Sequence, residues 1–212
     1  MSLIEDALAR GSRVILLNSV YQENPKESAE ILARCDYVSV REVLSQRELA
    51  EHGIQARLHI DHSFWSAVDE RAPFRDFSGQ TVFTDFWSRD FGNFGKLNSV
   101  EARKFPYLDL REMSWSSVVK SLRTASLLVT GRHHAVYAAC KAEIPFVALK
   151  GNSHKIEGLV MSSSAKIPIH SSMENVMTAV RDSAIVYDEF VKLFSWMKKQ
   201  PRWRFSGKDR SN

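Results

Sequence analysis

Positively charged or protonatable side chains follow three strands that the sequence predicts. Arg41 comes directly after one of them. Arg132 and His134 follow a second strand, and Lys155 lies in the segment after a third. Because ligands of parallel sheets bind at the carboxyl ends of the strands, we expect these side chains to meet at one edge. Arginine, lysine and imidazole donors in that position favour an anion with phosphate or carboxylate groups.

The turns after two of these strands also suit an anion. Gly131 and Gly151 allow the chain to turn tightly from strand into helix. The free N–H groups and the positive dipole end of each following helix add to the attraction. His133 and Asn152 lie in the same two turns and are further candidate binding residues. The sequence therefore predicts a cradle for a small, highly charged ligand.

Two of these residues have simpler interpretations. Arg41 could form a surface ion pair with Glu42 or Glu48. His134, at the start of an alanine-rich helix, could be a hydrogen-bonded core residue. Both alternatives stay open on the sequence alone.

Short apolar strands alternate with helices of about ten residues, which predicts an α/β fold with parallel sheets and right-handed crossovers. In the first run of elements, the expected helices are 4–10, 25–35 and 42–52, and the expected strands are 14–17, 37–40 and 57–60. In the second run, the expected strands are 81–86, 126–130, 144–149 and 167–169. Its expected helices are 114–124, 133–141, 155–161, 176–182 and 185–198.

Two local patterns refine this assignment. Ser171 and Glu174 form a capping box ahead of the helix 176–182. The segment 91–104 contains two glycines and two asparagines and is expected to be a surface loop.

The alternating pattern is interrupted at 61–80, which carries a proline, a glycine and mixed charges. This interruption predicts a domain boundary. We expect a partial Rossmann-like domain over 1–70, a Rossmann-like domain over 78–199 and a basic, aromatic tail over 200–212.

The composition is that of a soluble globular protein, with 44% hydrophobic and 25% charged residues, which excludes disorder. No apolar run reaches the roughly 18 residues of a membrane helix, and no export signal is visible at the start. A cytoplasmic location is therefore expected. Cys35 and Cys140 are expected to be reduced thiols rather than a disulfide.

The net charge of +4 is unevenly distributed. Residues 192–212 carry +6 and the rest of the chain −2, which argues against a nucleic-acid-binding surface. The aromatic residues interleaved with these basic ones are Phe194, Trp196, Trp203 and Phe205. Such a tail suits the inner face of an anionic membrane, where lipid-linked sugar acceptors lie; alternatively, its aromatic rings pack back on the protein.

Several motifs together resemble those of the polysaccharide pyruvyltransferase family. They are VSVRE at 38–42 with Ser45, TGRHHA at 130–135, Ile144-Pro145, and HKIEG at 154–158. The resemblance spans roughly residues 11–158. It departs from the family at Asp61-His62, where members usually carry Asp-Pro, and in the length of the first domain, of which only the last part is present.

The resemblance implies a fold similar to GT-B glycosyltransferases, with two Rossmann-like domains facing a cleft. It implies transfer of a pyruvyl group from phosphoenolpyruvate to a sugar hydroxyl as a ketal, with no further cofactor. Carried over to this chain, Arg41, Arg132 and Lys155 would bind the donor, and His134 would supply the proton that ketal formation needs. The implied partners are the small-molecule donor and a glycan acceptor, with a homo-oligomer as a further possibility.

Two other functions remain as alternatives: a non-catalytic anion- or sugar-binding module, and a glycosyltransferase that uses a nucleotide sugar. Other chemistry is disfavoured. His59 and His62 would lie on opposite faces of a strand with no third ligand nearby, so no metal site is expected. Ser153-His154 lacks the Gly-x-Ser-x-Gly elbow of a serine hydrolase.

Overall fold

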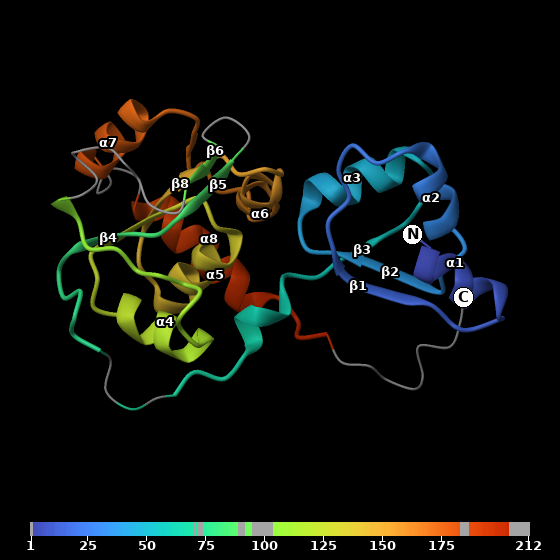
Figure 1. Cartoon of the computed structure of the whole chain (residues 1–212), viewed down its shortest axis with the longest axis horizontal. Helices are drawn as coiled ribbons and strands as arrows, with labels where there is room; N and C mark the ends of the chain where they lie inside the picture. The colour runs from blue at the N-terminus through green and yellow to red at the C-terminus, as the bar shows by residue number, and fades with distance from the viewer. Residues whose placement is uncertain are drawn as a thin grey trace.

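The computed structural model describes residues 2–69, 71, 74–88, 92–94, 104–182 and 187–203. Within these ranges the chain forms two lobes, each with its own parallel sheet (Figure 1). The first lobe comprises residues 2–60, and the second comprises the described residues of 81–199. The short 3-10 helix η1 (His62–Trp65) lies on the connection between them. This arrangement confirms the predicted Rossmann-like α/β architecture.

The first lobe has a three-stranded sheet in the order β1-β2-β3, and both pairings are parallel. Its elements are α1 (Ser2–Ala9), β1 (Ile15–Ser19), α2 (Lys26–Leu32), β2 (Tyr37–Val40), α3 (Val43–Glu51) and β3 (Arg57–Leu58). Val38 and Val40 of β2 pack with Leu32 of α2 and Leu49 of α3 in a small core. This packing fixes the end of β2, and therefore the residues that follow it.

The second lobe has a four-stranded parallel sheet in the order β4-β7-β8-β9, together with an antiparallel hairpin of β5 and β6. Its strands are β4 (Thr81–Phe83), β5 (Phe86–Ser88), β6 (Gly92–Phe94), β7 (Leu127–Thr130), β8 (Phe146–Leu149) and β9 (Ile169–His170). Its helices are α4 (Trp115–Leu122), α5 (His133–Ala142), α6 (Lys155–Ser162), α7 (Met173–Asp182) and α8 (Tyr187–Lys199).

The central strands β7 and β8 are buried along their whole length. Parallel strands covered on both faces read as continuous apolar runs, which is why the sequence predicted them well. Leu128 and Phe146 face the larger core with α4, α5, α6 and α8, whereas Val129 and Val147 face a smaller core with α7. The two helix layers hold the carboxyl ends of β7 and β8 side by side.

Some sequence-based expectations were wrong. The segment 91–104 is not a loop throughout, because Gly92–Phe94 pairs with β5 as a hairpin strand; residues 95–103 lie outside the described part of the chain. The strand expected over 81–86 ends at Phe83, and Phe86 already begins the hairpin. The predicted capping box is shifted by one position, since α7 starts at Met173 and the Ser172 hydroxyl accepts from the Asn175 N–H at 3.3 Å.

The other observations concern the thiols and the membrane. Cys35 and Cys140 are both free. Among the helices of the described residues, none is long and apolar enough to cross a bilayer.

Candidate active site

Predicted site residues from both lobes converge on a residue that sequence reasoning did not select, Asp61. Its Oδ2 atom accepts a hydrogen bond from Arg41 Nη1 at 2.6 Å and lies 3.4 Å from Nε2 of His134. Its Oδ1 atom accepts from the Ser63 N–H at 3.0 Å and so caps η1. The Asp61 N–H donates to the Tyr137 hydroxyl at 3.1 Å, which anchors the connection on α5. One carboxylate therefore holds the end of β2 beside the start of α5.

The environment of Asp61 keeps it ionised. Only 3% of the residue is exposed, and burial by itself would raise the pKa of the carboxyl. The hydrogen bonds from His134, Ser63 and Arg41 outweigh burial and hold the pKa of Asp61 far below its ordinary value. Asp61 therefore supplies one fixed negative charge to this site.

This pairing also corrects the surface alternative for Arg41. The guanidinium contacts neither Glu42 nor Glu48 through an ion pair among the described residues; its ion pair is with Asp61. The Arg41 side chain is 15% exposed, so it lies at the edge of the site rather than in open solvent.

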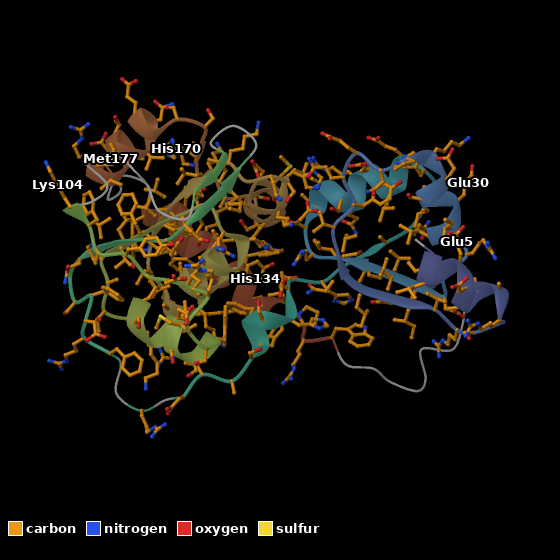
Figure 2. All side chains as sticks on the ribbon, in the orientation of Figure 1. Glu5, Glu30, Lys104, His134, His170 and Met177 are labelled. Atoms are coloured by element: carbon orange, nitrogen blue, oxygen red, sulfur yellow. The ribbon has the colours of Figure 1, made fainter. Side chains whose placement is uncertain are left out.

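The two histidines that begin α5 have opposite environments. His134 is not a core residue, because 63% of its side chain is exposed, and Figure 2 places it at the boundary between the two lobes. His133 is the buried one, with 8% exposure and its ring centroid 4.7 Å from that of Tyr137. Neither ring nitrogen of His133 has a hydrogen-bond partner among the described residues.

His133 is therefore a neutral imidazole beside charged groups. Burial, followed by the nearby charges of Arg41 and His134, lowers the pKa of His133 to about 3. A buried polar ring without partners costs stability in the unliganded protein.

Lys155, the first residue of α6, belongs to the same cluster. Burial lowers the pKa of its ammonium, and the charge of Arg41 lowers it further. No ion pair joins Lys155 to a carboxylate in the described part of the chain. Arg41 has an ion pair with Asp61 and Lys155 has none among the described residues, so the cluster has positive charge left for an anion.

Arg132 lies in a different group of side chains. Its Nε donates to Asp85 Oδ1 at 2.5 Å and its Nη2 donates to Asp85 Oδ2, a bidentate pair. This hydrogen bonding raises the pKa of Arg132, although burial opposes it. The Arg132 N–H donates to the Thr130 hydroxyl at 3.0 Å, which sets the turn between β7 and α5. Asp85 therefore balances the charge of Arg132 in this arrangement.

The structure brings Arg41, Lys155, His133 and His134 into one cluster, in which Asp61 contacts Arg41 and lies beside His134. It places Asn152 in the exposed turn before α6, without a contact to this cluster among those observed. Asp61 follows a strand just as the selected cations do, so the same strand-end rule applied to acidic residues would have found it.

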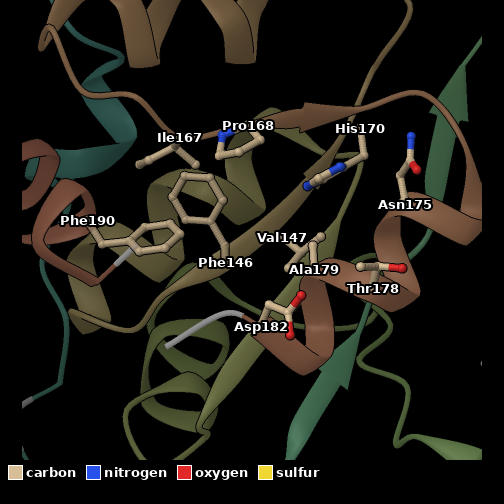
Figure 3. Close-up of a pocket in the computed structure, with 10 residues that line it drawn as sticks. All are labelled: Phe146, Val147, Ile167, Pro168, His170, Asn175, Thr178, Ala179, Asp182 and Phe190. Atoms are coloured by element: carbon tan, nitrogen blue, oxygen red, sulfur yellow. The ribbon is translucent and has the colours of Figure 1, made fainter. Parts of the chain in front are cut away.

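Two further observations separate this cluster from other features. A pocket of about 450 Å³ lies between β8, β9, α7 and Phe190 of α8, and none of the clustered residues lines it (Figure 3).

The described residues contain no group of three histidine, cysteine or acidic side chains suited to hold a metal ion. His59 bonds instead to the Tyr37 hydroxyl at 2.7 Å, and His62 stacks on Trp203 with ring centroids 6.0 Å apart.

The tail is partly described. Phe194 is buried and Trp196 packs against the core of the second lobe. Trp203 returns to the first lobe, where it contacts the rings of Tyr37 and His62. Phe205 lies outside the described residues, and the membrane contact of the tail stays a prediction.

Comparisons with known proteins identify the family of the chain. The family model described as polysaccharide pyruvyl transferase matches residues 1–153 of the 212. The match includes Arg41, Asp61, His133 and His134 and ends two residues before Lys155. A search of curated proteins found no match.

Proposed function

Because this chain belongs to the polysaccharide pyruvyl transferase family, we propose that it transfers a pyruvyl group from phosphoenolpyruvate to a sugar hydroxyl and forms a ketal. Family membership indicates pyruvyl transfer in general. The donor, the acceptor class and the residue roles below are the proposal.

One observation supports phosphoenolpyruvate most directly: Arg41 and Lys155 lie close together, and among the described residues Arg41 has its ion pair with Asp61 while Lys155 has none. Phosphoenolpyruvate carries a phosphate and a carboxylate, and two cations in a half-buried site bind and orient such an anion. The neutral ring of His133 carries one N–H, which can donate a hydrogen bond to this anion, and one unprotonated nitrogen, which can accept a hydrogen bond.

His134 is suited to the proton transfer, since its ring is accessible and its Nε2 faces Asp61. In the proposed reaction, His134 donates a proton to the methylene carbon of phosphoenolpyruvate, which leaves an oxocarbenium-like centre at C2. A sugar hydroxyl attacks C2 and loses its proton. The bond from C2 to the phosphate oxygen then breaks, inorganic phosphate leaves, and a second hydroxyl closes the ketal as it loses its own proton.

The role of Asp61 is to position the acid. A buried carboxylate orients the imidazole and stabilises its protonated form, as in other catalytic histidines that contact a carboxylate. Arg132 is a secondary binding residue for phosphoenolpyruvate. To bind this ligand, its guanidinium would have to be shared with Asp85. Asn152 extends the binding surface at the start of α6.

The acceptor is proposed to be a polysaccharide, glycolipid or nucleotide sugar, reached from the exposed side of His134. We further propose that the reaction needs no cofactor besides its donor, and that it takes place in the cytoplasm at or near the inner face of the membrane. Pairing with a second copy of the chain is a separate proposal that rests on the resemblance alone.

The test is to incubate the protein with phosphoenolpyruvate and a panel of acceptor sugars and to follow phosphate release and ketal formation by mass spectrometry. Release of phosphate with equimolar ketal supports the proposal. Binding of phosphoenolpyruvate without release would instead indicate a non-catalytic binding module. Glycosyl transfer from a nucleotide sugar would indicate a glycosyltransferase.

A further inference from the structure

The two lobes meet where the start of α3 contacts α6. Glu42, which is fully buried, caps α3 by accepting from the Leu44 N–H at 2.7 Å and the Ser45 N–H at 3.0 Å. The same carboxylate lies 3.3 Å from Nε2 of His154, the residue that precedes α6. The Ser45 hydroxyl lies 3.2 Å from the same ring nitrogen. A carboxylate of the first lobe thus faces an imidazole of the second.

Gly158 of α6 makes this approach possible. A Cβ atom at this position would lie 2.0 Å from Glu42 Oε2 and 2.6 Å from its Cδ. The Glu42 carboxylate cannot swing away freely, since its oxygens are engaged at the start of α3. Any side chain at Gly158 would therefore displace either the carboxylate or the helix.

Two further hydrogen bonds cross the same contact. The Val43 N–H, at the start of α3, donates to the Ser162 hydroxyl of α6 at 3.0 Å. The His154 N–H donates to Oε1 of Gln22 in the first lobe at 2.9 Å. The contact is therefore a set of directional bonds, which favours the observed register between the helices.

The residues next to this pair in sequence are the two cations of the active site. Arg41 precedes Glu42, and Lys155 follows His154. We propose that the Glu42–His154 pair, seated over Gly158, fixes the register of α3 against α6 and thereby holds Arg41 and Lys155 at one anion site. Glu42, His154 and Gly158 are positioning residues in this proposal, which rests on the proposed function for the identity of the anion.

The charges at the contact support an ionic pair. Burial by itself would lower the pKa of His154. The hydrogen bond to Glu42 outweighs burial, together with the negative charges of Glu42, Glu48 and Glu157, so the pKa of His154 lies above its ordinary value. Burial raises the pKa of Glu42, but the bonds to His154 and Ser45 bring it below its ordinary value. The imidazolium form therefore persists toward neutral pH, and its contribution is lost as the pH rises through the raised pKa of His154.

The first readout needs no ligand. Spin labels at Cys35, which is half-buried in the first lobe, and at Glu174→Cys on the exposed side of α7 report the distance between lobes. Cys140 is 1% exposed, so the label should not reach it. The labelled protein should give one narrow distance distribution. His154→Gln and Gly158→Ala should broaden or shift it, whereas the matched control His170→Gln, on β9, should not.

The second readout is the dissociation constant for phosphoenolpyruvate. His154→Gln and Gly158→Ala should weaken binding at least about tenfold, and KM should rise with a much smaller change in kcat, because the acid His134 is not touched. Binding to the parent protein should weaken as the pH rises through the pKa of His154, and this dependence should disappear in His154→Gln. Alanine favours helix over glycine, so a loss in Gly158→Ala cannot come from a weaker α6.

An unchanged distance distribution in both variants, or unchanged affinity in both, overturns the proposal. A parent protein that binds no phosphoenolpyruvate contradicts the proposed function instead, and the distance distributions still decide whether the pair fixes the register.

Discussion

Asp61 Oδ2 accepts a hydrogen bond from Nη1 of Arg41 at 2.6 Å at the point where the first lobe ends and the connection to the second begins. Both partners are largely withdrawn from solvent, with side chains 4% and 15% exposed. Breaking such a pair leaves a charge without its partner in a poorly solvated place.

Asp61→Asn should therefore lower the free energy of unfolding by about 2 to 4 kcal/mol. It should also reduce turnover, since His134 loses the carboxylate it faces. Chemical denaturation measures the first effect and phosphate release the second. Glu30→Gln, which removes an exposed pair with Lys26, serves as the control and should change neither; equal stabilities for both variants would contradict the role of Asp61.

The pH dependence of stability should reveal His133. Its pKa is about 3 in the folded protein and near 6.5 when unfolded, so the unfolded chain binds the extra proton first as the pH falls. Stability should therefore be full above about pH 6.5 and decrease below it, by about 2 to 3 kcal/mol at pH 4.5. In His133→Gln the loss of stability between pH 6.5 and pH 4.5 should be smaller by about 2 to 3 kcal/mol. Identical slopes for the two proteins would show that His133 is not buried as a neutral ring.

Asp85 should compete with the donor for Arg132. Asp85→Asn removes the carboxylate that holds the guanidinium, so if Arg132 binds phosphoenolpyruvate, its affinity should rise a few-fold. Isothermal titration measures the change, and Arg132→Ala in the same background should abolish it. An affinity that Asp85→Asn leaves unchanged would remove Arg132 from the donor site.

Much of the architecture could be predicted from sequence because its signals are local. The continuous apolar runs predicted β7 and β8, and the strand ends selected from the sequence supplied most of the clustered residues. Glu42 and Gly158 were missed as site residues because their roles depend on contacts between segments far apart in the chain. Asp61 was missed because only cationic and histidine side chains were considered at the strand ends. The β5–β6 hairpin was missed because glycine and asparagine are as typical of loops as of hairpins.

The predicted membrane contact can be tested separately. Removing residues 198–212 should weaken binding to vesicles that contain anionic lipid, and raising the salt concentration should weaken binding of the full chain, because the attraction is electrostatic. Neutral vesicles are the control. Equal sedimentation of the full and shortened chains with anionic vesicles would contradict this prediction.

His134 is expected to protonate bound phosphoenolpyruvate. The most direct measurement is phosphate release by His134→Asn beside its dissociation constant for phosphoenolpyruvate. Because His134 is 63% exposed, the variant should fold and bind the donor within about threefold of the parent, while release should fall by about 100-fold or more. Release at a rate close to that of the parent would contradict the account.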